Sequence, residues 1–91
     1  MATLIRTNGE IEEDFIASSL KDKQEAIGGY AQFVSIKPNK TMVINEDGWY
    51  LNLKVNQKAS DIYGDTVVGD VILYDKYELL ADDYADYWFL L

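Results

Sequence analysis

Three aspartates near the end of the chain have the spacing of a metal-binding box. Asp82, Asp83 and Asp86 form a DDxxD pattern, which in larger enzymes holds Mg²⁺ and a substrate diphosphate inside a deep apolar cavity. Magnesium bound in this way also needs cationic side chains for the phosphates, and only Lys76 is near in sequence. A chain of 91 residues is too short to enclose such a cavity. We therefore predict no metal site and no cofactor.

Other patterns that could support catalysis are equally weak. The chain has no histidine and no cysteine, so the usual general base, the commonest zinc ligand and the thiolate nucleophile are all missing. Asp61, Asp65 and Asp70 lack the alternating spacing of a calcium loop. Gly28-Gly29 follows a predicted helix, whereas a phosphate-binding loop precedes one. We predict a protein without catalytic residues; carboxylate chemistry assisted by Mg²⁺ is the remaining enzymatic alternative.

The negative charge is concentrated in the last third of the chain. Of the net charge of -8, residues 1–58 contribute -1 (seven Lys or Arg against eight Asp or Glu) and residues 59–91 contribute -7 (one against eight). Such a chain repels nucleic acids and anionic membranes, and no apolar run approaches the ~18 residues of a transmembrane helix. We expect a soluble protein whose macromolecular partner presents a basic surface, with no direct contact to nucleic acid or membrane.

The C-terminal segment has the periodicity of an amphipathic helix. Its apolar stripe consists of Tyr77, Leu80, Tyr84, Tyr87, Trp88 and Leu91. Carboxylates four residues apart on the opposite side repel one another and weaken the helix. A sequence selected for stability alone would more often have lysine at some of these positions, so the carboxylates favour docking to a basic surface. The predicted docking residues are Glu78, Asp82, Asp83, Asp86 and Phe89. A solvated acidic face, or a homodimer formed through this helix, are alternatives that the sequence leaves open.

The partner that fits this prediction best is a host protein that binds nucleic acid. In the channel of a nuclease, carboxylates would stand where phosphates normally bind, and aromatic rings would stand where bases stack. A second hypothesis is a binding protein for a small ligand such as a nucleotide signal. Its predicted pocket residues are Asn56, Lys58, Asp61, Tyr63 and Asp65, which would line a pocket within one chain or across a dimer.

The strands that must position these side chains are short. Asn8-Gly9 suits the positive φ angles of a tight hairpin turn and predicts strands at residues 2–6 and 10–14; an irregular approach to the first helix is the alternative for the second run. The stretch "YAQFVSIKPNKTMVINEDGWYLNLKVN" predicts a three-strand meander with turns at Pro38-Asn39 and at residues 45–48. Its third strand alternates in polarity, which predicts one buried face. The apolar side chains assigned to that face are Trp49, Leu51, Leu53 and Val55.

Two short helices and one further strand complete the predicted domain. The segment "SSLKDKQEAIGG" is a helix capped by Ser18 or Ser19 and ended by Gly28 in the left-handed conformation. "QKASDIYG" gives one or two helical turns closed by Gly64, and the continuous apolar run in "DTVVGDVILYD" is typical of a central strand. We expect one α+β domain over residues 1–91. It has an antiparallel sheet of four to five strands and two or three short helices, the last a C-terminal amphipathic helix.

Several motifs within residues 28–75 resemble those of a known family. They are Asn45-Glu46-Asp47-Gly48, Val55-Asn56-Gln57-Lys58-Ala59, Ile62-Tyr63-Gly64-Asp65 and Val68-Gly69-Asp70-Val71. They are similar to motifs of a small uncharacterised domain family from phages, plasmids and integrative elements of Gram-positive bacteria. The resemblance implies an accessory protein of a mobile element in the cytoplasm of a bacterial host. Neighbouring genes in such elements often counter host defence, including restriction and CRISPR nucleases.

Overall fold

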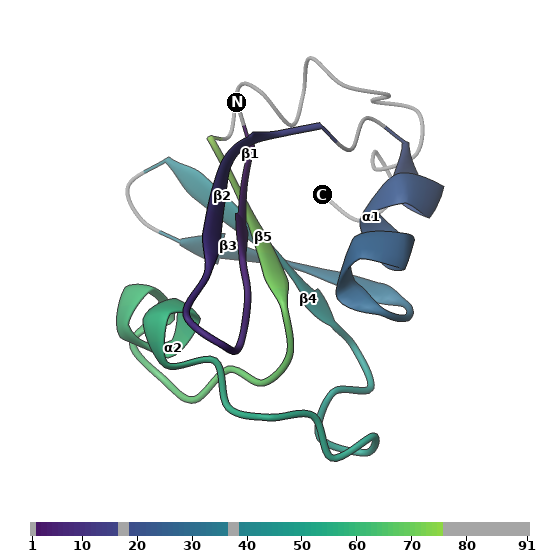
Figure 1. Cartoon of the computed structure of the whole chain (residues 1–91), viewed down its shortest axis with the longest axis vertical. Helices are drawn as coiled ribbons and strands as arrows, with labels where there is room; N and C mark the ends of the chain where they lie inside the picture. The colour runs from purple at the N-terminus through teal and green to yellow at the C-terminus, as the bar shows by residue number, and fades with distance from the viewer. Residues whose placement is uncertain (1, 17–18, 37–38, 76–91) are drawn as a thin grey trace.

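The computed structural model describes residues 2–16, 19–36 and 39–75, and it has the α+β architecture that the sequence predicts (Figure 1). The elements are β1 Ala2–Ile5, β2 Ile11–Phe15, α1 Leu20–Ile27, β3 Ala31–Ile36, β4 Lys40–Asn45, α2 Gln57–Tyr63 and β5 Val71–Asp75. The five strands form one sheet in the order β2-β1-β5-β4-β3, and every neighbouring pair is antiparallel. None of the helices described in these ranges is long and apolar enough to cross a membrane.

The last strand, β5, lies between two hairpins. It pairs with β1 on one side, where Ile72 is opposite Leu4, and with β4 on the other side, where Ile72 is opposite Val43. Val71 and Ile72 are completely buried, because a central strand is covered on both faces. The prediction of a central strand in this segment is therefore confirmed.

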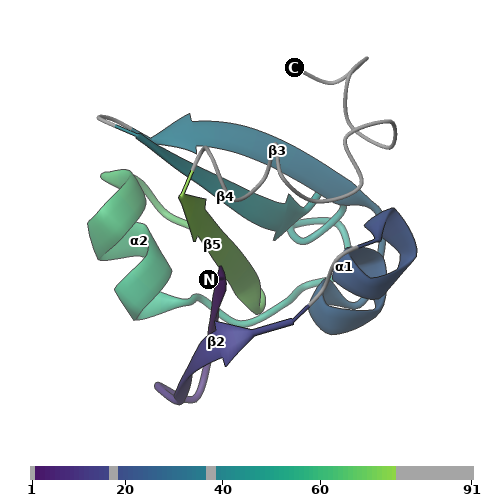
Figure 2. The ribbon, with the colours of Figure 1, turned by 90° about the horizontal axis from the view of Figure 1, so that it is seen from above.

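Each face of the sheet is covered by one helix, so that the sheet is the middle layer of three (Figure 2). Ile27 of α1 belongs to an apolar cluster with Leu4, Val43, Ile72 and Tyr74. Ala59 of α2 belongs to a second cluster, whose other buried members are Ile5, Met42, Val67 and Val71. Neighbouring residues of a strand enter different clusters, as the alternation of side chains along a strand requires.

The helix boundaries follow the predicted caps. Ser19 precedes α1, and its hydroxyl accepts a hydrogen bond from the Asp22 N–H at 3.0 Å. Gly28 and Gly64 end α1 and α2 with φ angles of 81° and 89°, which a residue without a β-carbon adopts without strain. Both helix ends are thus determined by local sequence.

The first hairpin forms where Asn8-Gly9 predicts it, but its turn differs in detail. The Arg6 N–H donates to the Glu10 carbonyl at 2.9 Å and the Gly9 N–H donates to the Arg6 carbonyl at 3.1 Å. Only Gly9 of the pair has a positive φ, 92°. This is the pattern of a three-residue loop with a bulged glycine rather than of a two-residue turn.

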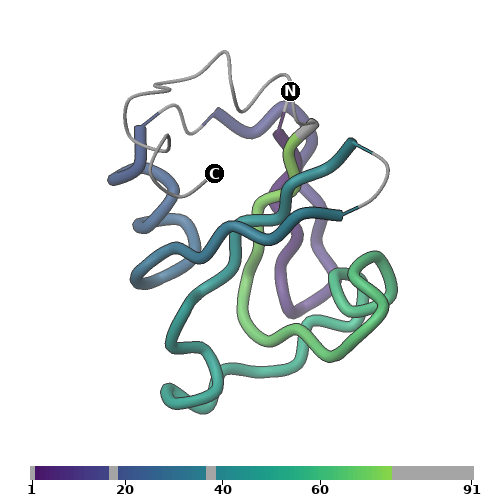
Figure 3. The backbone as a smooth tube through the Cα atoms, turned by 180° about the vertical axis from the view of Figure 1, so that it is seen from behind, coloured from purple at the N-terminus to yellow at the C-terminus, as the bar shows by residue number. Residues whose placement is uncertain are grey.

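The predicted third strand of the meander is wrong. Residues 46–52 form turns instead, and they extend beyond the end of the sheet at the bottom of Figure 3. Trp49, Leu51 and Val55, which were assigned to a buried face, are exposed. The physical reason is that β5 pairs with the edge of β4 that a third meander strand would need. The alternating residues therefore have no free strand edge with which to pair, and their apolar side chains have no sheet face to join.

The predicted C-terminal amphipathic helix lies outside the described residues. The last described helix, α2, is an internal helix that precedes β5.

Candidate functional site

The five residues predicted to bind a ligand all lie on α2 or beside it, and Asn56 is the one that is buried. The amide nitrogen of Asn56 donates to the carbonyl oxygens of Ile5 and Gly69, both at 2.9 Å. Its side-chain oxygen accepts from the Ala59 N–H at 3.1 Å and so caps α2. Because the side chain is 0% exposed, its polar atoms face other parts of this protein. The structure gives Asn56 a role in joining β1, α2 and the segment before β5.

The other four predicted ligand residues are exposed on the surface of α2 and the turn after it. They are Lys58, Asp61, Tyr63 and Asp65. Asp61 accepts a hydrogen bond from the Gln57 side chain at 3.0 Å, and Asp65 accepts one from the Thr66 N–H at 2.7 Å. Both carboxylates therefore have hydrogen-bond partners close to them in sequence. Ligand binding at this surface stays a prediction.

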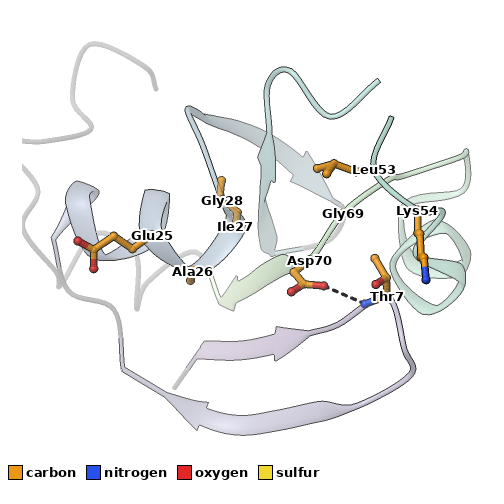
Figure 4. Close-up of a pocket in the computed structure, with 9 residues that line it drawn as sticks. All are labelled: Thr7, Glu25, Ala26, Ile27, Gly28, Leu53, Lys54, Gly69 and Asp70. Carbon is orange, nitrogen blue, oxygen red and sulfur yellow. Dashed lines mark hydrogen bonds between the residues drawn. The ribbon is translucent and has the colours of Figure 1, made fainter. Parts of the chain in front are cut away.

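A shallow hollow of about 320 Å³ lies between α1, Lys54, Asp70 and Thr7 (Figure 4). Asp70 accepts a hydrogen bond from the Thr7 N–H at 2.9 Å, and its other oxygen is 3.6 Å from the Arg6 guanidinium. The side chains of Glu25 and Lys54 lie at opposite ends of the hollow in Figure 4. Because the polar groups do not converge on one point, the hollow lacks the arrangement that orients a small ligand.

Sequence reasoning did not assign a role to Asp70, although the family motifs single it out. The structure shows that it connects the β1–β2 turn to the start of β5. Within the described ranges, no group of three Asp, Glu, His or Cys side chains is placed to hold a metal ion.

Acidic side chains gather instead on the outer strand β2 and on the residue before it. Glu10, Glu12, Glu13 and Asp14 occupy four of five consecutive positions, and all four are exposed. Asp14 has a positive φ of 58°, and the register between β1 and β2 shifts close to it. An edge strand that is both charged and irregular resists pairing with other strands. We call residues 10–14 the acidic edge.

The predicted docking residues Glu78, Asp82, Asp83, Asp86 and Phe89 lie outside the described residues. The acidic edge is not visible in the charge totals of residues 1–58 and 59–91, because the lysines of the first 58 residues offset its carboxylates in that sum. The local signal was the run Glu-Ile-Glu-Glu-Asp directly after the Asn8-Gly9 turn.

Comparison with known proteins gives a family assignment. The model of a domain of unknown function, DUF3846, matches residues 1–86, a longer stretch than the motifs in residues 28–75 suggest. No curated protein matches the chain, and no solved structure matches it. The match extends over both hairpins, both helices and the acidic edge, and the chain therefore belongs to the DUF3846 family of uncharacterised domains.

Proposed function

We propose that this protein is a small acidic binding protein, without enzymatic activity, that inhibits a host factor by docking on a basic surface of it. The observation that carries the proposal is the acidic edge, with its four exposed carboxylates in five residues. Glu10 has a weak ion pair with Arg6, at 3.9 Å. The overall charge of -8 adds long-range attraction to a basic partner.

The spacing of these charges supports mimicry of a nucleic acid. An antiparallel strand rises about 3.4 Å per residue, and one strand of B-DNA carries one phosphate charge per 3.4 Å of helix axis. Counted over both faces, the four carboxylates in the five residues of the acidic edge therefore have a linear charge density similar to that of a DNA strand. A groove that neutralises phosphates with Lys and Arg would accept such a strand by the same electrostatic attraction.

The host factor that fits this chemistry is an enzyme that binds nucleic acid, such as a restriction or CRISPR nuclease. In this proposal the protein is an accessory protein of a phage or other mobile element and acts in a bacterial cytoplasm. Glu78, Asp82, Asp83 and Asp86 would extend the acidic surface in this proposal, with Phe89 as an apolar contact.

The experiment compares three forms of the tagged protein in affinity capture from bacterial lysate, with quantitative mass spectrometry. In the first variant, Glu10, Glu12 and Glu13 are changed to Gln and Asp14 to Asn, which also tolerates a positive φ. The control variant carries Asp61→Asn and Asp65→Asn, and so removes exposed charge elsewhere.

We expect the wild type and the control to enrich the same nucleic-acid enzyme, and the acidic-edge variant to lose it. The purified enzyme should then be inhibited by the wild type, and the inhibition should weaken as salt is raised, since exposed charges are screened. Equal enrichment by all three forms, or an enzyme that is captured but not inhibited, would contradict the proposal.

A further inference from the structure

Residues 46–52, which we call the aromatic loop, expose three large apolar side chains in a row. Trp49 is 67% exposed, Tyr50 is 87% exposed and Leu51 is 49% exposed. Single exposed apolar residues are ordinary, but a contiguous group that is rimmed by polar residues is typical of an interaction site. Trp and Tyr are also the side chains that most often dominate the binding energy of protein interfaces.

Backbone hydrogen bonds hold the aromatic loop in one shape. The Leu51 N–H donates to the Asp47 carbonyl at 2.8 Å, and the Asn52 N–H donates to the Trp49 carbonyl at 3.2 Å. The Leu53 N–H closes the loop by donating to the Gly48 carbonyl at 3.0 Å. The loop is thus a set of consecutive tight turns, and its three apolar side chains project from an ordered backbone.

The base of the loop is fixed to the body of the protein. Asn45 is buried, and its side chain accepts from the Asp47 N–H at 2.9 Å and donates to the Ile27 carbonyl of α1 at 3.2 Å. Gly48 packs so closely that a β-carbon there would lie 2.8 Å from a methyl group of Val68. A loop that is already ordered loses little entropy on binding, which makes its apolar side chains more effective as anchors.

Charge decides what kind of surface the loop can meet. Glu46 and Asp47 are exposed at its start, and the whole chain carries -8. Two copies that met through this loop would bring like charges together, which opposes self-association. A partner whose apolar pocket is rimmed by Lys or Arg could bind the apolar side chains of the loop and pair with its two carboxylates.

We propose that the aromatic loop is the apolar anchor of the docking surface: Trp49 and Tyr50 enter an apolar pocket of the partner protein, and Lys or Arg at its rim faces Glu46 and Asp47. This inference rests on the proposed function, because it takes the partner surface to be basic. It adds that the acidic edge alone does not hold the partner.

The test is selection of binders from a library of random peptides displayed on bacteriophage, with the wild-type protein as bait. The selected peptides are synthesised, and their affinity is measured by calorimetry for the wild type and four variants. The loop variant carries Trp49→Ser, Tyr50→Ser and Leu51→Ser. The control carries Ile16→Ser, which removes exposed apolar surface elsewhere. The third is the acidic-edge variant described above, and the fourth carries Glu46→Gln and Asp47→Asn.

We expect the selected peptides to combine Lys or Arg with aromatic or aliphatic residues. The loop variant should bind them at least about tenfold more weakly, as loss of interface anchors does, and the control should bind them like the wild type. Changing Glu46 to Gln and Asp47 to Asn should weaken binding and reduce its dependence on salt. Thermal unfolding of each variant checks that the fold is retained. If the loop variant has lost it, Trp49→Ala alone replaces it in the comparison.

Three results would overturn the inference. Basic peptides that bind the loop variant as tightly as the wild type, but do not bind the acidic-edge variant, would show that the aromatic loop is not an anchor. The proposed function would be unaffected by that result. Sedimentation that shows a wild-type dimer, and a monomer for the loop variant, would mean that a second copy covers the loop. Selected peptides without basic residues would contradict the proposed function and the basic rim together.

Discussion

Replacement of Asn56 by alanine should strongly destabilise the protein, because its buried side chain makes three hydrogen bonds to backbone groups. Two of them go to the Ile5 and Gly69 carbonyls and the third caps α2 at Ala59. A buried hydrogen bond contributes about 1 kcal/mol net, and loss of a cap costs about 1 kcal/mol. The summed loss is about 3 kcal/mol, which is a large part of the stability of a small domain.

The measurement is urea unfolding followed by circular dichroism, together with thermal unfolding. A loss of about 3 kcal/mol should lower the melting temperature by about 15 °C, since a domain of this size loses about 4–8 °C per kcal/mol. Gln57→Ala is the matched control. It removes only an exposed side-chain bond to Asp61, and it should change stability by less than about 0.5 kcal/mol.

The variant Asn56→Asp separates the cap from the two donated hydrogen bonds. It keeps an acceptor for the Ala59 N–H but places a carboxylate against two carbonyl oxygens in a buried position, which raises the pKa of that carboxyl group. Because the folded pKa would exceed the unfolded value of about 3.9, the folded state binds the proton more tightly, and its stability falls as pH rises through this interval. The deficit of this variant relative to wild type should therefore be larger at neutral pH than near pH 4. An Asn56→Ala protein that unfolds within about 0.5 kcal/mol of the wild type would refute this reasoning.

Substitutions at three further positions test the packing and the caps. Gly48→Ala should cost about 1–3 kcal/mol in urea unfolding, because its β-carbon would meet Val68 at 2.8 Å; an unchanged midpoint would show that the base of the aromatic loop is not tightly packed. Ser19→Ala should cost about 1 kcal/mol through loss of the α1 cap, and Ser19→Asp should restore most of it in the same assay. Ile72→Ala should cost about 2–5 kcal/mol, since Ile72 is fully buried at the centre of the sheet, and a smaller loss in calorimetric unfolding would contradict its assigned place in the core.

Local signals in the sequence predicted the parts of the fold that depend on neighbouring residues. Ser19, Gly28 and Gly64 determine helix ends through their own conformations and hydrogen bonds. The first hairpin likewise follows from Asn8-Gly9, although the turn uses a positive φ only at glycine. These features need no information about distant segments, and that is why they could be read from the chain alone.

Features that depend on distant segments could not be predicted. The residues after β4 have the alternation of a strand, but whether they pair depends on β5, which takes the free edge of β4. Asn56 was singled out by its type and position, yet its hydrogen bonds reach residues 51 and 13 positions away. No local pattern distinguishes such a buried polar side chain from one that faces a ligand.

The position of β5 between the hairpins also has a consequence for folding during synthesis. The β1–β2 and β3–β4 hairpins can each form early, because their strands are close in sequence. The strand that joins them in one sheet comes last of the five, at residues 71–75. A nascent chain therefore has to reach this point, and emerge from the ribosome, before the two halves can share a core. Pairing of β1 with β5 closes a loop of more than sixty residues, and such distant contacts slow folding. Chains interrupted before residue 71 would thus expose both hairpins to the proteases of the cell.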